Sequence, residues 1–249
     1  MERERAVTDG GWERLAPGVA RLRLPAWDCT VGLVTAGGTA LLVDAGASVR
    51  EGGAVRAGAQ SLLGGGRVTH LALTHPHFDH VLGAGAFAGV TTYGAVGVEG
   101  LLGSPQGRAA LYADAVRHGL DEDEAAQAAD LARAPEHTVS GEFTLGLDGG
   151  RRVLLANVGP AHTGHDLVVV VPGAGPAAPT VVFCGDLVEE SGPPQAGPDA
   201  VPARWPDALD RLLDLGGEDA LYVPGHGAVV DAAFVRAQRA ELDAAHGVS

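Results

Sequence analysis

Short apolar blocks, separated by Gly, Pro and charged residues, recur along most of the chain and predict β-strands. The block at 67–74, "RVTHLALT", is continuously apolar after His70, which is typical of a strand buried on both faces of a sheet. The other predicted strands cover residues 19–24, 29–35, 39–43, 142–147, 151–156, 166–171, 180–184 and 219–223. Segments rich in Pro and Gly, such as "PGAGPAAP" and "SGPPQAGP", predict surface loops.

Helix signals lie between these strands. Ser48 and Glu51 have the spacing of a capping box and Gly64 is a suitable stop, so we expect a helix between them. Two further helices are predicted near 204–215 and 231–245. Strands interspersed with helices are typical of the α/β class.

Residues 104–134 predict a helical hairpin inserted between strands. Ser104, followed by a proline, has the pattern of a helix start, and Gly119 has that of a helix end. Asp121 with Glu124 then begins a second helix, which runs to about residue 133.

Length and charge narrow the class of protein. The 249 residues suffice for one α/β domain with a well-buried core, and we expect a single domain over residues 1–249. All 17 basic residues are Arg, and the 31 acidic residues bring the formal net charge to −14 at pH 7. Because this charge repels a phosphate backbone, we expect a small-molecule substrate and no nucleic-acid partner.

The chain shows no sign of export or of membrane contact. Its first residues, "MERERAVTDGGWERLAPG", lack the apolar core of a secretory signal, and no apolar stretch is long enough to cross a bilayer. We therefore expect a cytoplasmic protein with no membrane partner; the sequence does not set its oligomeric state. Cys29 and Cys184 lie in apolar strand-like sequence, which predicts buried free thiols.

Candidate chemistry is concentrated in "LALTHPHFDHVLG", where three histidines and an aspartate occupy six positions after an apolar strand. Three more residues of the same kind follow other predicted strands: His162, Asp186 and His226. Functional groups of α/β folds gather where strands end, so we expect these segments to meet.

Such a set of side chains suits two metal ions. The sets we expect are His75, His77 and His162 for the first ion, and Asp79, His80 and His226 for the second, with Asp186 as a bridge. Two divalent ions contribute +4, two carboxylates −2 and one hydroxide −1, which leaves about +1 to attract a substrate oxygen. Five imidazoles and two carboxylates in one pocket without cations would be costly to bury.

The spacing His75-Pro-His77-Phe-Asp79-His80 resembles the H-x-H-x-D-H signature of the metallo-beta-lactamase fold superfamily, and the single residues in "AHTGH", "CGDL" and "PGHG" resemble its later ligands. The resemblance covers nearly the whole chain. It implies a four-layer αβ/βα sandwich with the 104–134 hairpin inserted, and a dinuclear site on one edge of the sandwich.

An aspartate at 186 followed by Leu resembles the glyoxalase II, lactonase and thioesterase branches of this superfamily. The resemblance implies a hydrolase in which a hydroxide bridging two Zn²⁺ ions cleaves an ester, thioester, lactone or related acyl bond, with Asp79 and Asp186 as the catalytic carboxylates. The C-terminal region offers only Arg236 and Arg239 to hold a glutathione carboxylate, which disfavours that thioester. Iron and manganese are the alternative metals.

Two other functions stay open. A mononuclear iron dioxygenase acting on a thiol or persulfide would use His77, His162 and Asp186. A non-catalytic metal-binding protein is the third reading, although such proteins tend to lose ligands.

Further residues are expected around the site. Asp44, His165 and Asp166 are candidates for hydrogen bonds that orient the ligands. The 104–134 hairpin is a candidate lid over the substrate, with Leu111, Tyr112 and Val116 facing the pocket.

Overall fold

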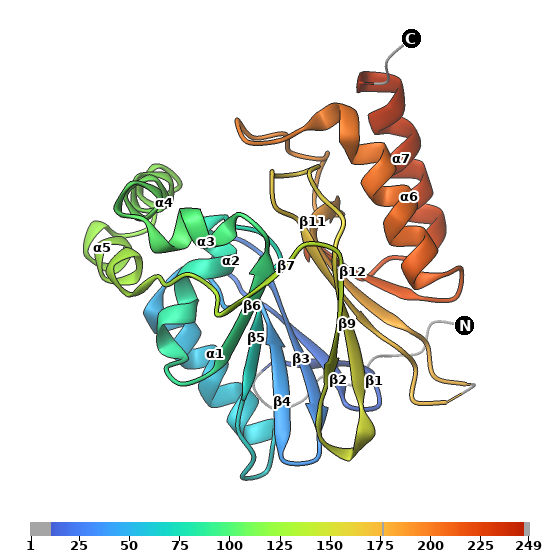
Figure 1. Cartoon of the computed structure of the whole chain (residues 1–249), viewed down its shortest axis with the longest axis horizontal. Helices are drawn as coiled ribbons and strands as arrows, with labels where there is room; N and C mark the ends of the chain where they lie inside the picture. The colour runs from blue at the N-terminus through green and yellow to red at the C-terminus, as the bar shows by residue number, and fades with distance from the viewer. Residues whose placement is uncertain (1–10, 176, 247–249) are drawn as a thin grey trace.

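The computed structural model describes residues 11–175 and 177–246. Within them, two sheets pack face to face, and helices cover the outer face of each sheet (Figure 1). The predicted α/β class, with two sheets between outer helices, is confirmed. None of the helices in these two ranges combines the length and apolar character that a membrane crossing needs.

The first sheet has seven strands in the order of the chain. They are β1 (Glu13–Ala16), β2 (Val19–Arg23), β3 (Thr30–Ala36), β4 (Thr39–Val43), β5 (His70–Ala72), β6 (Thr91–Ala95) and β7 (His137–Val139). The helices that follow its strands are α1 (Val49–Leu62), α2 (Phe78–Val81), α3 (Val98–Gly103), α4 (Pro105–Arg117) and α5 (Glu122–Leu131). Strands β4 to β7 are parallel, so β4, β5 and β6 all end at the same edge.

The second sheet has five strands in the order β12-β11-β10-β9-β8. They are β8 (Glu142–Gly146), β9 (Arg152–Asn157), β10 (Leu167–Val171), β11 (Val181–Glu189) and β12 (Leu221–His226). Helices α6 (Trp205–Gly216) and α7 (Ala232–His246) lie on its outer side (Figure 1).

Strand β10 shows why the chain forms two cores. Leu167, Val169 and Val171 face the first sheet and belong to the larger core, while Val168 and Val170 point to α6 and α7 and belong to a second core. Successive side chains of a strand point to opposite faces, so a strand covered on both faces must be apolar throughout.

The predicted helix starts are also found. Ser48 caps α1 by accepting from the Glu51 N–H, Ser104 caps α4, and Asp121 caps α5. The sequence analysis missed the short strands β1, β6 and β7 and the helix α3. Both cysteines are free and buried, as expected.

One close approach sets where α2 lies. Gly52 of α1 packs on the 3-10 turn Leu82–Ala86 that continues α2, and a Cβ on Gly52 would stand 2.2 Å from the Gly83 carbonyl oxygen. Gly83 in turn donates its N–H to the Gly46 carbonyl at 2.7 Å. The missing side chain at Gly52 therefore lets the segment that carries Asp79 and His80 lie directly on the first helix.

The substitution Gly52→Ala tests this contact. We expect it to lower the free energy of unfolding by about 1–3 kcal/mol, because the added methyl group overlaps backbone that must shift. The neighbouring Gly53→Ala is the control, since a Cβ there meets nothing within 4 Å. That variant should gain about 0.5–1 kcal/mol from helix propensity. Urea unfolding measures both changes. If both substitutions shifted the midpoint of unfolding in the same direction from the wild type, the prediction would be contradicted.

Candidate metal centre

The edge where β5 ends carries the first four candidate residues. His75 and His77 follow β5 on loop backbone, and His77 is the N-cap of α2. Asp79 and His80 lie in the single turn of α2 and are buried, as is His75. A helix starting three residues after His75 thus turns the chain back and brings all four side chains to one place.

Asp186 comes from the second sheet, and its place corrects the sequence analysis. It lies inside β11 rather than after it. Gly185 adopts φ +54°, and the pairing of β11 with β12 shifts register on both sides of Gly185. This irregularity interrupts the side-chain alternation of the strand. Gly225 of β12 leaves room for the carboxylate, because a Cβ there would stand 1.7 Å from Asp186 Oδ1.

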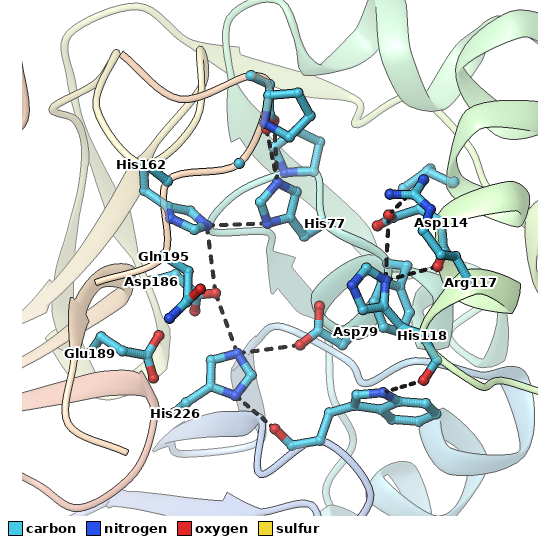
Figure 2. Close-up of a pocket in the computed structure, with 18 of the residues that line it drawn as sticks. His77, Asp79, Asp114, Arg117, His118, His162, Asp186, Glu189, Gln195 and His226 are labelled. Carbon is cyan, nitrogen blue, oxygen red and sulfur yellow. Dashed lines mark hydrogen bonds and ion pairs between the residues drawn. The ribbon is translucent and has the colours of Figure 1, made fainter. Parts of the chain in front are cut away.

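Four imidazoles surround the Asp186 carboxylate, and Figure 2 shows two of them, His162 and His226. Its Oδ2 atom lies 3.6 Å from His75 Nε2, 3.6 Å from His162 Nε2 and 3.3 Å from His226 Nε2. Its Oδ1 atom lies 3.2 Å from His80 Nε2. Asp186 therefore stands between two groups of side chains.

The two groups are those that the sequence predicts. On one side, His162 Nε2 lies 3.1 Å from His77 Nδ1, and these two with His75 and Asp186 offer donor atoms that all lie within 4.8 Å of one another. On the other side, Asp79 Oδ2 lies 3.3 Å from His226 Nε2 and 3.6 Å from His80 Nε2. All seven predicted side chains thus converge.

The outer nitrogen of a ring, the one that points away from Asp186, meets an acceptor in four of the five histidines; that of His162, Nδ1, is buried without a hydrogen-bond partner among the described residues. His80 Nδ1 lies 2.9 Å from Asp44 Oδ2, and His226 Nδ1 lies 2.8 Å from the Trp27 carbonyl oxygen. His77 Nε2 lies 3.2 Å from Asp199 Oδ2. Carboxylates and carbonyls only accept, so these three outer nitrogens carry hydrogen.

His75 follows the same rule through Thr74. The Thr74 hydroxyl donates to Asp44 Oδ2 at 2.7 Å, so its oxygen accepts from His75 Nδ1, 3.0 Å away. In these four rings the inner nitrogen is thus the one left to bind an electron-pair acceptor.

Burial and nearby charge shift the pKa values of the site histidines in opposite directions. Burial lowers the pKa of His75 well below its usual value and that of His162 to about 4. Burial acts the same way on His80 and His226, but the negative groups around them outweigh it, so the pKa of His80 is well above its usual value and that of His226 is raised to about 11. Burial would raise the pKa of the Asp186 carboxyl, yet His80 and His75 beside it hold that pKa well below its usual range. The site stabilises positive charge.

These residues fit divalent metal ions. Two buried atoms aimed into the group, His75 Nε2 and Asp186 Oδ1, have no hydrogen-bond partner within the described part of the chain. Imidazole nitrogens and carboxylate oxygens are the donors that zinc takes, and a metal would satisfy both orphaned atoms. Cys29 also touches His80, but its Sγ lies 3.7 and 3.8 Å from the two ring nitrogens. This near-equal spacing is that of a sulfur against the ring, not of one approaching the Nε2 atom alone.

The three predicted supporting residues have different roles. Asp44 contacts the site, through His80 and Thr74. Asp166 instead holds the backbone around His162, accepting from the N–H groups of Ala161 and Thr163. His165 points away: its Nδ1 lies 2.9 Å from the Val96 carbonyl oxygen, so it supports the turn before α3.

A cavity of about 820 Å³ opens above the site. One face of α4 lines it with Gly107, Ala110, Leu111, Asp114 and Arg117, and His118 follows. The loop 191–199 forms the opposite wall. The hairpin thus faces the site.

The lid prediction is corrected in part. Leu111 lines the cavity, whereas Tyr112 and Val116 do not and pack against the larger core. Successive helix residues are rotated by about 100°, which turns Tyr112 by about 100° and Val116 by about 140° from Leu111 and away from the cavity.

Several site residues were missed by the sequence analysis. Asp199 directly follows the Pro- and Gly-rich stretch that the sequence marks only as a surface loop, and His118, just after α4, lines the cavity. Glu189 ends β11, is 7% exposed and lines the cavity. Burial, and then the charge of Asp186, raise the pKa of Glu189 to about 7. An acidic residue so near Asp186 was the available signal.

Comparisons with known proteins agree with this geometry. The sequence model of the metallo-beta-lactamase superfamily matches residues 24–226. The metallo-beta-lactamase FIM-1 from Pseudomonas aeruginosa, in its mono-zinc form, is 19% identical, with 94% of this chain and 95% of that chain covered and a TM-score of 0.69. DIM-1 exposed to ceftazidime is 18% identical, with 94% and 96% covered and a TM-score of 0.68. VMB-1 at pH 5.5 gives the same four values: 18%, 94%, 96% and 0.68. These structures share the fold.

The division of the histidines can be measured in metal-free protein. At pH 7 we expect His75 and His162 to be neutral and His80 and His226 to be imidazolium, because burial dominates the first pair and carboxylates the second. Two-dimensional ¹H–¹⁵N spectra of the imidazoles between pH 5.5 and 8.5 would show this. Four rings titrating together near their ordinary pKa would contradict it.

Proposed function

Because the chain belongs to the metallo-beta-lactamase superfamily and is a metal-dependent hydrolase, we propose that its site binds two zinc ions and cleaves an ester, thioester, lactone or related acyl bond. The observation that carries the proposal is that two groups of metal-ligand side chains both include Asp186. Asp186 shares one group of donor atoms with His75, His77 and His162 and another with His80 and His226, and Asp79 Oδ2 lies 3.3 Å from His226 Nε2.

His75, His77 and His162 would hold one ion, and Asp79, His80 and His226 the other, with Asp186 shared. When bound, two zinc ions supply Lewis acidity and hydroxide at neutral pH. The chain contributes oriented rings: the outer hydrogen bonds of His75, His77, His80 and His226 keep the inner nitrogens of these four rings aimed into the site. Asp79 and Asp186 contribute negative charge that offsets part of the charge of the cations.

No side chain along the cavity is placed as a nucleophile. Ser191 lines it, but its hydroxyl donates to Glu189 Oε1 at 2.7 Å and meets no base aligned by a third group. Cys29 is buried, and burial raises the pKa of its thiol to about 12. Both observations favour water as the attacking group. The α4 face and the 191–199 loop would hold the acyl substrate over the site and limit the access of bulk water.

The residues of a mononuclear iron site, His77, His162 and Asp186, are part of the same group. A single iron would leave His80, His226 and Asp79 without an ion, although they are held as firmly as the first set. This arrangement favours two metals.

Metal analysis tests the proposal. Protein purified without tag or chelator should contain about two zinc ions per chain by plasma mass spectrometry, and should hydrolyse simple esters or thioesters in a zinc-dependent manner. His162→Ala and His226→Ala should each lower the zinc content by about one ion. The control is His165→Ala, three residues after His162 but turned to Val96, which should keep both ions. One iron per chain would favour the dioxygenase, and no metal after reconstitution would overturn both.

The room left by Gly225 gives a second test. Gly225→Ala places a methyl group on the Asp186 carboxylate, so we expect zinc affinity to fall by roughly 10–100-fold in competition with a chelator. Gly192→Ala is the matched control: Gly192 also lines the cavity, but a Cβ there meets nothing within 4 Å. Equal zinc affinity in the two variants would refute the placement of Asp186.

A further inference from the structure

Glu189 is a buried carboxylate that the proposed chemistry does not use. It ends β11, three residues after Asp186, and Figure 2 shows its side chain beside Asp186 and His226 at the cavity. Its backbone N–H donates to Gln238 Oε1 at 3.0 Å, and its Oε1 accepts from the Ser191 hydroxyl at 2.7 Å. The residue is thus held in place, while no hydrogen bond within the described residues engages its Oε2 atom.

The other charged residues of the cavity are already paired. Arg117 is the cavity's one arginine among the described residues, and its guanidinium lies 3.2 Å from Asp114 Oδ1. Asp199 is held by His77. Glu189 makes no ion pair with an arginine in the described part of the chain, and the sequence contains no lysine. Outside the metal ligands, Glu189 is therefore the unneutralised charge of the cavity.

The unfavourable free energy of burying Glu189 can be offset by a bound ligand. Burying a carboxylate without a partner is unfavourable, and a cation that enters the cavity would recover part of that energy. Apart from the polar side chains of Ser191 and Gln195, the rest of the described wall is apolar or aromatic. The Trp27 ring meets Phe78 edge-on at 5.4 Å, and Phe78 stacks on His118 at 5.4 Å. An anionic substrate would find no free cation on these walls apart from the metals.

We propose that Glu189 is a specificity residue that receives a positively charged group, such as a primary ammonium, of the acyl substrate. The inference rests on the proposed hydrolase function. Substrates that carry a carboxylate or phosphate at the corresponding place are rejected by the same charge. The substrate class is then an amine-bearing ester, thioester or lactone rather than an anionic conjugate.

Three esters of equal length test this on zinc-loaded protein. They are the p-nitrophenyl esters of hexanoic acid, 6-aminohexanoic acid and the monoester of adipic acid, whose far ends are neutral, cationic and anionic. Assays at pH 8 keep the Glu189 carboxyl group ionised. We expect kcat/KM for the cationic ester to exceed that for the anionic ester by roughly 10–100-fold, the range of a charged hydrogen bond.

Glu189→Gln keeps the shape of the side chain and removes its charge, so the cationic-to-anionic ratio should fall to within about threefold of one. Glu190→Gln is the matched control: it makes the same change one residue later, on an exposed side chain that bonds the Ala228 N–H outside the cavity. That variant should keep the wild-type ratio. A ratio unchanged in Glu189→Gln, or an equal loss for all three esters, would show a structural role and overturn the inference.

A binding measurement separates this inference from the proposed function. Titration calorimetry of zinc-loaded protein with hexylammonium should show a Kd that rises at least about tenfold in Glu189→Gln and not in Glu190→Gln. If no ester is hydrolysed but this difference holds, the hydrolase proposal fails and the cation subsite stands. If the esters are hydrolysed without preference and hexylammonium binding is unaffected, the subsite fails and the hydrolase stands.

Discussion

The carboxylate of Asp44 is the interaction on which the site depends. Asp44 directly follows β4, adopts the left-handed region with φ +60°, and is 1% exposed. One oxygen accepts the Thr74 N–H, and the other accepts from the Thr74 hydroxyl and from His80 Nδ1. Because the Thr74 hydroxyl then accepts from His75, a single carboxylate orients one ring of each group. It joins the end of β4, the loop after β5 and the turn of α2.

The second sheet supplies the remaining side chains of the site, including Asp186. Its contribution depends on two glycines, since Gly185 breaks the regularity of β11 and Gly225 leaves room for the Asp186 carboxylate. The hairpin turn before β3 adds the Trp27 carbonyl, which holds His226. The carboxylates that lie beside His80 and His226 also raise the pKa of both rings, so both stay protonated when no metal competes for them.

The sequence predicted the parts whose signals are local. The apolar blocks are found as strands, and the capping residues Ser48, Ser104 and Asp121 are found at helix starts. The seven ligand-type residues converge as expected. Strands such as β7, three residues long and largely exposed, carry too little apolar pattern to be recognised. Asp199 and Glu189 could not be assigned, because their role comes from contacts with His77 and from the cavity, across the fold. The prediction that Tyr112 and Val116 face the cavity was wrong, because the position of a side chain around the helix, and not its apolar character, decides whether it faces a cavity.

The division of the ligands between the sheets has a consequence for the order of assembly. His75, His77, Asp79 and His80 follow a strand of the first sheet, whereas His162, Asp186 and His226 belong to the second, up to 151 positions along the chain (226 − 75). A chain that has formed only one sheet offers only part of either donor set. Complete loading therefore comes after the sheets dock, and each ion then acts as a crosslink between the two halves, adding its binding free energy to the contact that holds them together.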